Sequence, residues 1–376
     1  MRSLGRKPEG ARLERIKASP RWAGERFRNL HPIAPGLRDP NVPMPSVSQF
    51  LRGGERRVPR GPLPTLNPLD AWRKPPASGL RATWLGHSTV LLEIDGVRVL
   101  TDPVWGTRAS PTRLAGPKRF QPPPVPLRAM PPVDLVLISH DHYDHLDYPT
   151  VRALAAWETP FVTSLGVGSH LEAWGIGAER ISELDWWESY RLPTAELTVT
   201  AAPSQHFSGR TPKRRNETLW SSLIIRSPRH TVFFSGDSGL TEEYQLIREH
   251  AGPFDLVMLE IGAFHASWGD MHLGPENALK AHALLGGGPF LPVHWGTFAL
   301  AMHAWDQPAE VLLQRSAQAG GQLLMPRLGE PVEPAQGRNL EPWWREVEAV
   351  PRPMVHPDAG APDAGALAKP LFWPVD

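Results

Sequence analysis

Val133-Asp-Leu-Val-Leu-Ile-Ser-His-Asp-His-Tyr-Asp-His-Leu-Asp147 joins an apolar run to a cluster of side chains that bind metals. A continuous run of Val, Leu and Ile is typical of a strand buried on both faces. In extended backbone His140 and His142 point to the same side, because side chains alternate along a strand. Beyond the turn, Asp144 and His145 can face a second point nearby. Imidazole nitrogens with a carboxylate favour zinc, so the spacing predicts two metal ions side by side.

Three later apolar runs stop in the same manner, each at one further His or Asp. They are Leu197–Ala202 before His206, Thr231–Phe234 before Asp237, and Phe290–Val293 before His294. Any one of these residues alone is more often an ordinary polar group of a loop. Four strand ends that each carry such residues predict that seven ligands meet at one edge of the fold.

This ordered set of seven residues resembles the ligand set of the metallo-β-lactamase-fold hydrolases. Flanking segments resemble one branch of them more closely, the N-acyl-phosphatidylethanolamine-hydrolysing phospholipase D family, over residues 81–330. The segments that carry this resemblance are Thr83–Thr89, Leu100–Pro103, Arg108–Pro111, Gly116–Phe120, Glu183–Glu188, Pro203–Phe207 and His294–Leu300.

The resemblance implies an α/β fold, a four-layer α/β/β/α metallo-β-lactamase sandwich in a single domain. We expect a basic, Pro-rich N-terminal arm over residues 1–80, the catalytic domain over 81–335, and a C-terminal extension over 336–376. The extension is of low complexity from residue 351 onward, which predicts disorder there.

The resemblance also implies the roles of the ligands and the reaction. His140, His142 and His206 would hold the first zinc ion, Asp144, His145 and His294 the second, and Asp237 would bridge them. The expected activity is hydrolysis of N-acyl-phosphatidylethanolamine to N-acylethanolamine and phosphatidic acid, through attack by a hydroxide that the two metals share. Asp144 would then count as catalytic as well as metal-binding.

Three further residues are candidates with competing interpretations. His272 matches a functional histidine of the family and could protonate the leaving alkoxide, or it is a histidine of a surface loop. His87 could orient a metal ligand or contact substrate, or it is a hydrogen-bonded histidine of the core. Arg210, four residues after His206, could bind a substrate phosphate bidentately, or it forms a structural ion pair.

Local patterns predict further elements. Ala82–Trp84, Val90–Ile94 and Val97–Thr101 alternate as an opening β-meander, with Asp95-Gly96 as a turn. Residues 103–132 are rich in Pro and predict a long irregular loop of the kind that often covers a site. Helical patterns occupy Tyr148–Ala156, Glu242–His250, Glu276–Leu285 and Ala309–Ala319.

Composition narrows the class of protein. The 376 residues include no Cys, which excludes disulfides, thiolate metal ligands and a cysteine nucleophile. The chain opens on a charged stretch rather than a secretory signal, and no apolar run approaches the length of about 18 residues that a membrane span requires. We therefore expect a cytoplasmic protein.

Charge is distributed unevenly along the chain. Residues 1–81 hold 17 Lys and Arg against 6 Asp and Glu, a balance of +11, whereas the whole chain carries +1. This arm could bind an anionic membrane surface and make the protein peripheral to it, or it could be a strap paired with acidic groups of the body. The arm lacks interleaved aromatic residues, so nucleic acid is not an expected partner. A homodimer stays open.

Other functions fit the same ligands. A metal-dependent lactonase would attack a cyclic ester carbonyl at the same centre, and a nuclease would need an RNA-gripping domain that is not visible in the sequence. A non-catalytic binding module is the alternative outside enzymes, and a complete set of seven ligands argues against it.

Overall fold

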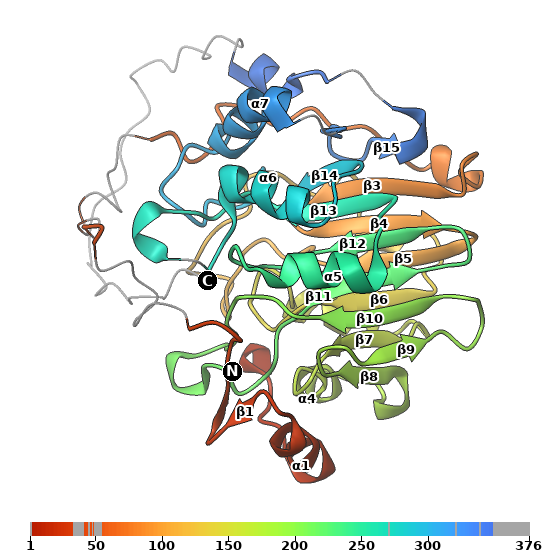
Figure 1. The fold of residues 1–376 in the computed structure, drawn as a ribbon, viewed down its shortest axis with the longest axis vertical. Coiled ribbons are helices and arrows are strands. Elements are labelled where there is room, and N and C mark those ends of the chain that lie inside the picture. The colour runs from red at the N-terminus through yellow and green to blue at the C-terminus, as the bar shows by residue number, and fades with distance from the viewer. Residues whose placement is uncertain are drawn as a thin grey trace, which may run out of the picture.

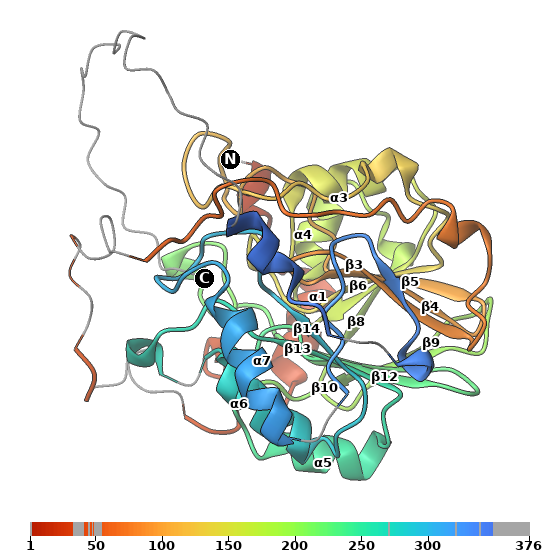
Figure 2. The same cartoon turned by 90° about the horizontal axis from the view of Figure 1, so that it is seen from above.

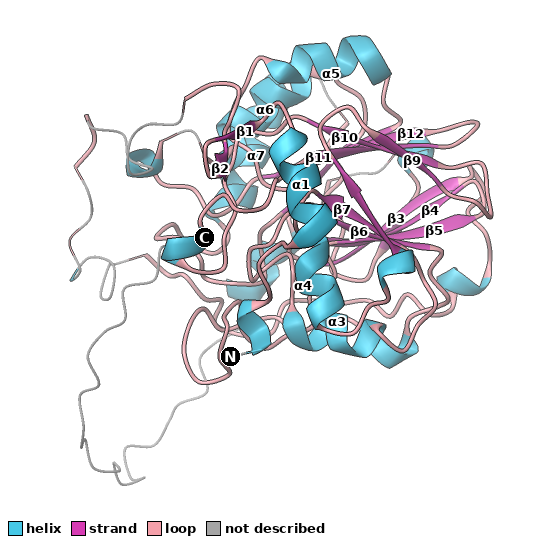
Figure 3. Ribbon diagram, turned by 90° about the horizontal axis from the view of Figure 1, so that it is seen from below, coloured by secondary structure: helices cyan, strands magenta, loops and turns pink. Residues whose placement is uncertain are grey.

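A computed structural model describes residues 2–32, 41–43, 46, 48, 55–269, 271–319, 322–337 and 340–348 of the chain. Two β-sheets lie face to face, and helices cover the outer face of each sheet (Figure 3). Apolar side chains of both sheets are buried together between them and form the largest core cluster. The predicted four-layer α/β/β/α sandwich is confirmed.

The seven-stranded sheet contains the opening meander and continues as parallel strands. Its order is β15 (Pro331–Val332), β3 (Leu80–Gly86), β4 (Thr89–Ile94), β5 (Val97–Thr101), β6 (Leu135–Ile138), β7 (Phe161–Ser164) and β8 (Ile181–Leu184). Pairing is antiparallel from β15 to β5 and parallel from β5 to β8. All four residues of β6 are buried, as expected for a central parallel strand.

The six-stranded sheet combines three parallel strands with three antiparallel ones. Its order is β14 (Phe290–Val293), β13 (Leu256–Glu260), β12 (Thr231–Phe234), β11 (Ser222–Arg226), β10 (Thr198–Ala202) and β9 (Ser189–Arg191). The strands β12, β13 and β14 are parallel, and the remaining pairs are antiparallel. Parallel neighbours bring the carboxyl ends of β12 and β14 to the same edge.

Helices form the two outer layers, as Figures 2 and 3 show. On the seven-stranded side lie α3 (Tyr148–Leu154) and α4 (Gly168–Ala173), and on the six-stranded side lie α5 (Glu243–Ala251), α6 (Gly274–Leu284) and α7 (Gln307–Ala319). The Asp147 side chain accepts the N–H of Thr150 and thereby caps α3, which begins directly after the metal-binding motif. None of the described helices is long and apolar enough to cross a bilayer.

Several predicted elements match the structure closely. The strands β5, β12 and β14 have the predicted bounds, and the four predicted helices correspond to α3, α5, α6 and α7 within a few residues. The sequence patterns missed α1, α4, β7, β8, β9, β11 and β13. These elements are short, and several lack a clear alternation of apolar and polar residues.

The N-terminal arm contains a helix, α1 (Gly10–Ala18), and a short hairpin of β1 (Trp22–Ala23) with β2 (Arg26–Phe27), all below the sheets in Figure 1. Cations of this arm pair with acidic residues of the body. Lys7 Nζ lies 2.8 Å from Glu217 Oε1, and Arg15 Nη2 lies 2.5 Å from Glu188 Oε2. Arg12 contacts two carboxylates, with Nε 2.5 Å from Glu183 Oε2 and Nη1 2.7 Å from Glu172 Oε2. These contacts agree with the strap alternative for α1.

The described end of the chain packs on the core. Trp343 and Trp344 are buried, and their rings lie 5.7 and 5.8 Å from that of Trp295, which also stacks on Trp84 at 5.2 Å. The predicted boundaries near residues 80 and 335 stay predictions. The low-complexity tail from residue 351 lies outside the described residues.

Candidate metal centre

The seven predicted ligands meet at one edge of the sandwich. His140, His142, Asp144 and His145 follow β6 of the seven-stranded sheet, whereas His206, Asp237 and His294 follow β10, β12 and β14 of the six-stranded sheet. Each of the seven is no more than 3 % exposed. Buried histidines and carboxylates in this number need partners, and metal ions are the partners that suit them.

Four of these residues form a first group. His140 Nε2 lies 2.9 Å from His142 Nδ1, and His206 Nε2 lies 3.2 Å from the same atom. Asp237 Oδ2 lies 3.7 Å from both His140 Nε2 and His206 Nε2. One ligand atom from each of the four lies within 4.8 Å of all the others, so they can surround a single ion.

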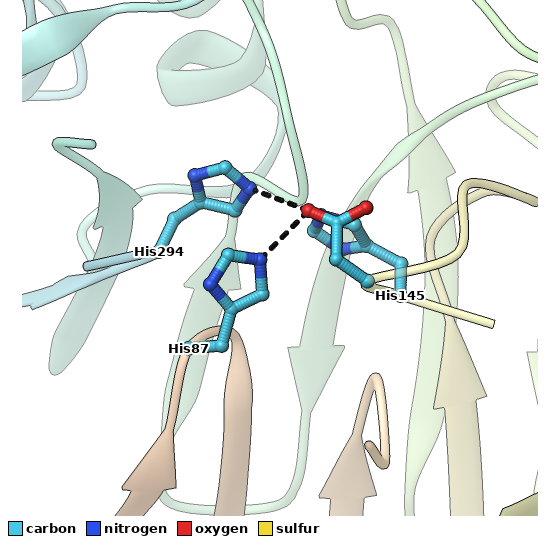
Figure 4. Close-up of side chains that lie close together, drawn as sticks. His87, His145 and His294 are labelled. Atoms are coloured by element: carbon cyan, nitrogen blue, oxygen red, sulfur yellow. Dashed lines mark hydrogen bonds and ion pairs between the residues drawn. The ribbon is translucent and has the colours of Figure 1, made fainter. Parts of the chain in front are cut away.

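A second group lies beside the first and consists of His87, Asp144, His145 and His294 (Figure 4). Asp144 Oδ2 lies 2.8 Å from His87 Nε2, 3.3 Å from His294 Nε2 and 3.5 Å from His145 Nε2. Asp237 also reaches this group, at 3.1 Å from His145 Nε2 and 3.3 Å from His294 Nε2. One carboxylate therefore borders both groups.

Outer hydrogen bonds fix which imidazole nitrogen faces the centre. His145 Nδ1 lies 2.7 Å from Oδ2 of Asp102, and His206 Nδ1 lies 2.9 Å from the carbonyl oxygen of Met271. Both Nδ1 atoms must donate to these acceptors, which leaves the Nε2 lone pairs directed inward. His145 Nε2 and both oxygens of Asp237 are buried and make no hydrogen bond. The donor set therefore fits divalent metal ions.

Electrostatics keep the carboxylates ionised. Burial alone would raise the pKa of Asp237, but the imidazoles of His145 and His294, which are positively charged when no metal is bound, hold that pKa well below its ordinary value. The same competition, dominated after burial by His145, lowers the pKa of Asp144. Carboxylates that stay ionised when buried are suited to cation binding.

Three residues at this edge of the fold have strained backbone angles. His87, Asp102 and His294 all adopt positive φ angles, of 53°, 33° and 64°. Non-glycine residues rarely do so, and such strain persists where the surroundings hold it. Gly236, with φ of 55°, approaches β6 so closely that a Cβ atom would lie 2.6 Å from Ser139 Cβ. This glycine lets Asp237 turn into the centre.

His272 lies beside the two groups and is held by a carboxylate that the sequence analysis missed. Its Nδ1 lies 2.6 Å from Oε2 of Glu260, which ends β13. The His272 ring lies 5.0 Å from that of His206 and 5.5 Å from that of His294. Burial raises the pKa of Glu260 despite the charge of His272. The structure thus places His272 in the centre rather than on a surface loop.

The two candidate substrate contacts have other partners in the structure. Burial, and then the charge of His294, lower the pKa of His87 to about 3, so its neutral ring donates Nε2–H to Asp144. Arg210 is 2 % exposed and donates four hydrogen bonds to the carbonyl oxygens of Ser3, Asp141 and Leu146. A phosphate contact would have to replace some of these bonds, so substrate contact by either residue stays a prediction.

Three supporting residues escaped the sequence analysis. Asp102 and Glu260 end β5 and β13, so the pattern of an apolar strand that stops at an acidic residue applied to both. Asn29 gave no such signal. Its side chain donates to the His206 carbonyl oxygen at 2.7 Å and accepts the His206 N–H at 3.0 Å. The arm thereby holds the backbone of a candidate ligand 177 positions away.

A cavity of about 230 Å³ opens onto the centre. His142 and Asp144 lie on its wall together with apolar groups of Tyr143, Phe207 and Leu300. Residues 109–111, 116 and 117 of the predicted long loop form another side, and residues 207–212 with Arg215 form a third. The cavity has room for the reacting part of a substrate, and its walls favour apolar neighbours of that part.

Comparison with known proteins agrees with this geometry. Residues 97–295, more than half of the chain, match the family model described as "Beta-lactamase superfamily domain". An uncharacterized protein of Mycobacterium tuberculosis is 45% identical over 331 residues, which cover 87% of this chain and 88% of that protein. The N-acyl-phosphatidylethanolamine-hydrolyzing phospholipase D 1 of Caenorhabditis elegans is 39% identical over 237 residues, 59% of this chain and 65% of that protein.

A solved structure shows the same fold. Igni18, a metallo hydrolase from the archaeon Ignicoccus hospitalis, superposes with a TM-score of 0.54 at 23% identity and covers 67% of this chain and 97% of that one. Its fold agrees with the sandwich described above. The chain belongs to the beta-lactamase superfamily and is a metal-dependent hydrolase with the metallo-β-lactamase fold.

Proposed function

We propose that this hydrolase is a zinc-dependent phosphodiesterase of the phospholipase D type that cleaves N-acyl-phosphatidylethanolamine into N-acylethanolamine and phosphatidic acid. The observation that carries the proposal is Asp237, which borders two groups of buried ligands and so suits a pair of metal ions. Paired ions are a common solution for phosphodiester cleavage. The relative from Caenorhabditis elegans, named for this substrate, supports the choice of lipid.

In this proposal each group holds one zinc ion. His140, His142 and His206 bind the first, Asp144, His145 and His294 bind the second, and Asp237 is shared. Zinc suits a site of five imidazoles and two carboxylates. When bound, the pair lowers the pKa of water and offsets negative charge on the phosphoryl oxygens.

The protein's own groups have two tasks in the reaction. Tyr143, Phe207 and Leu300 line the cavity and keep bulk water from the reacting phosphodiester. His272, with Nδ1 bonded to Glu260, exchanges a proton with the leaving oxygen at Nε2. The carboxylate of Glu260 orients the ring and stabilises its protonated form.

The decisive experiment presents three substrates to the zinc-loaded protein under the same conditions: N-acyl-phosphatidylethanolamine, a water-soluble phosphodiester reporter and a simple lactone. We expect hydrolysis of the lipid with release of N-acylethanolamine, and little cleavage of the lactone. Efficient lactone hydrolysis with an intact lipid would instead identify a lactonase. Metal analysis of the same preparation should give about two zinc ions per chain, and a value near zero would reject the proposed centre.

We further propose that the protein reaches this lipid as a peripheral membrane protein. Leu114 is 90 % exposed and lies within the loop that lines one side of the cavity. It is flanked by Arg113 and Lys118, and the arm supplies further cations. An apolar tip among cations is suited to an anionic lipid surface.

Vesicle sedimentation tests this contact. Anionic vesicles should bind the protein at low salt and release it as salt rises, because surface attraction decays over a Debye length of about 8 Å at physiological ionic strength. Leu114→Asp should weaken binding, whereas Leu246→Asp, at an exposed position of α5, should not. Equal binding to neutral and anionic vesicles would contradict the role of the cations.

A further inference from the structure

Arg215 lies on the wall of the cavity, one aromatic ring away from the candidate metal ligands. Its Cζ atom lies 4.4 Å from the centre of the Phe207 ring. The same Phe207 ring also contacts two imidazoles. Its centre lies 4.6 Å from the ring centre of His142 and 4.7 Å from that of His206. The guanidinium is therefore close to the metal centre without being part of it.

No described acidic residue pairs with Arg215. Among the residues that the structure describes, its guanidinium forms no ion pair and no hydrogen bond, although the side chain is partly buried. Its neighbour Arg214 is different, since it donates to Glu217 at 3.1 Å and to the Leu4 carbonyl oxygen at 3.4 Å. A partly buried cation without a counterion is unfavourable unless a ligand supplies the negative charge.

A second arginine, Arg26, lies next to Arg215 and is exposed. The N–H of Phe27 donates to the Asn216 carbonyl oxygen at 2.8 Å, and the Asn216 side chain donates to the Phe27 carbonyl oxygen at 3.2 Å. These bonds bring Arg26 of the arm beside Arg215, and burial together with the charge of Arg26 lowers the pKa of Arg215. In the described part of the chain Arg26 likewise forms no ion pair. Two neighbouring cations repel each other until an anion lies between them.

The backbone that carries Arg215 is held in place. Gly209 donates its N–H to Asp141 Oδ1 at 2.7 Å and has a φ of 133°. A Cβ atom on Gly209 would lie 2.9 Å from Arg215 Cα, so this loop closes tightly on itself. These contacts hold the backbone at Arg215, and the Phe207 ring supports the guanidinium at the cavity wall.

We propose that Arg215 and Arg26 form an anion-binding subsite for a second negatively charged group of the substrate, a carboxylate or a phosphate, while the reacting ester lies at the metal centre. The inference rests on the proposed function for the identity of the reacting group only. It adds to the proposed substrate class those esters that carry a second anion a short distance from the reacting phosphorus. Guanidinium groups bind such anions bidentately through short, charge-assisted hydrogen bonds.

Calorimetric binding to the zinc-loaded protein tests the subsite without turnover. The probes are propylphosphonate and a series of alkylene bisphosphonates with three to six methylene groups. One phosphonate should bind at the metals in every probe, so only the second can contact Arg215. We expect the best bisphosphonate to bind at least about tenfold more tightly than propylphosphonate, and Arg215→Gln to abolish this difference.

Arg214→Gln is the matched control, because Arg214 adjoins Arg215 but already has partners. It should keep the tenfold preference, and Arg26→Gln should reduce it in part. Zinc content and circular dichroism of each variant verify folding, and Arg26→Gln serves as the test if Arg215→Gln does not fold. Equal affinity of wild type for both probe types, or an equal loss in Arg214→Gln, would overturn the proposal.

Steady-state kinetics in neutral detergent micelles then test whether the second anion is a carboxylate of the lipid headgroup. N-acyl-phosphatidylserine differs from N-acyl-phosphatidylethanolamine by one headgroup carboxylate. Arg215→Gln should raise KM for the former about tenfold and leave KM for the latter unchanged. A protein that binds bisphosphonates as expected and hydrolyses neither lipid would keep the subsite and reject the phospholipase. Equal effects of Arg215→Gln on both lipids would contradict the subsite.

Discussion

Single hydrogen bonds behind the ligands determine how the metal centre is assembled. Asp102 accepts the backbone N–H of Ser139 at 2.7 Å, its hydroxyl at 2.6 Å and Nδ1–H of His145 at 2.7 Å. Burial raises the pKa of Asp102, and the bonds from His145 and Ser139 oppose that rise. The carboxylate thus orients one ligand and links it to the strand end that carries the others.

Asp102→Asn should lower the affinity for the second zinc ion by about 10- to 100-fold, the usual cost of removing a group that orients a metal ligand. The amide oxygen can still accept the His145 bond, but the negative charge that makes the imidazole a stronger ligand is lost. Competition with a chelating dye measures the change. Asp95→Asn, in the β4–β5 turn, removes the charge that pairs with Arg229 at 2.5 Å and should not alter zinc affinity. Unchanged zinc binding in Asp102→Asn would refute the role of Asp102.

Asp237→Asn should reduce hydrolysis at least about 100-fold, the scale seen when an electrostatic contact to the transition state is lost. The substitution removes the one carboxylate that borders both ligand groups, so the second ion should be lost first. Steady-state rates and metal analysis of the same sample measure both effects. Asp134→Asn, where an exposed carboxylate accepts only the Arg98 N–H, is the control. Full activity with two ions retained would show that Asp237 does not bridge them.

Ligand candidates were easier to predict than the residues that support them. His140 and His142 could be recognised because they occupy alternate positions directly after an apolar, β-branched run. Asp102 and Glu260 each end a strand as well, but a lone acidic residue in that position has too many ordinary explanations. Arg210 is a different case, because its place near a ligand suggested a phosphate contact, and in the structure its guanidinium donates to carbonyl oxygens, so that contact stays a prediction.

The N-terminal arm directly contacts the backbone that carries one of the candidate metal ligands. Its hairpin is bonded to the loop after β10, and Asn29 makes reciprocal hydrogen bonds with the backbone of His206. Asn29 Oδ1 also accepts Nε1–H of Trp220 at 3.2 Å. Composition left two alternatives for the arm, a membrane contact or a strap on the body, and it says nothing about which loop such a strap would contact.

Asn29→Ala should lower the free energy of unfolding by about 1–3 kcal/mol, because it leaves the partly buried N–H and C=O of His206 without partners. It should also reduce the rate of hydrolysis about tenfold through displacement of the ligand. Chemical denaturation and steady-state kinetics measure the two effects. Asn277→Ala, on the surface of α6, should change neither. A stability loss with zinc affinity and rate intact would limit Asn29 to a structural role.

At the scale of the whole molecule, the centre joins the two sheets. Four ligands come from the seven-stranded sheet and three from the six-stranded sheet, so each proposed ion has ligands on both sides of the sandwich. Without metal, the carboxylates and imidazoles of the two sheets face one another with few hydrogen bonds. Metal binding should therefore favour the packing of the two sheets, and loss of metal should weaken that packing.

Removal of metal should lower the melting temperature by several degrees, and zinc should restore it. A metal ion at a free concentration of about 1,000 times its dissociation constant stabilises the folded protein by roughly 4 kcal/mol. Differential scanning fluorimetry with and without a chelator measures the shift. Calcium, which prefers oxygen ligands, should restore little of it. Identical melting of the chelated and zinc-loaded protein would separate the centre from the stability of the sandwich.

The contact between Asn29 and His206 has a consequence for synthesis of the protein. The arm leaves the ribosome before the body of the domain, and the partner of Asn29 follows 177 residues later. At translation rates of about 5–20 residues per second, the arm waits roughly 10–35 s before this contact can form. The acidic partners of Arg12 and Arg15, at residues 172, 183 and 188, are synthesised late in that interval, so for most of it chaperones or polyanions in the cell meet the arm as a free basic segment. Docking of the arm on His206 is consequently a late event in the biogenesis of the enzyme.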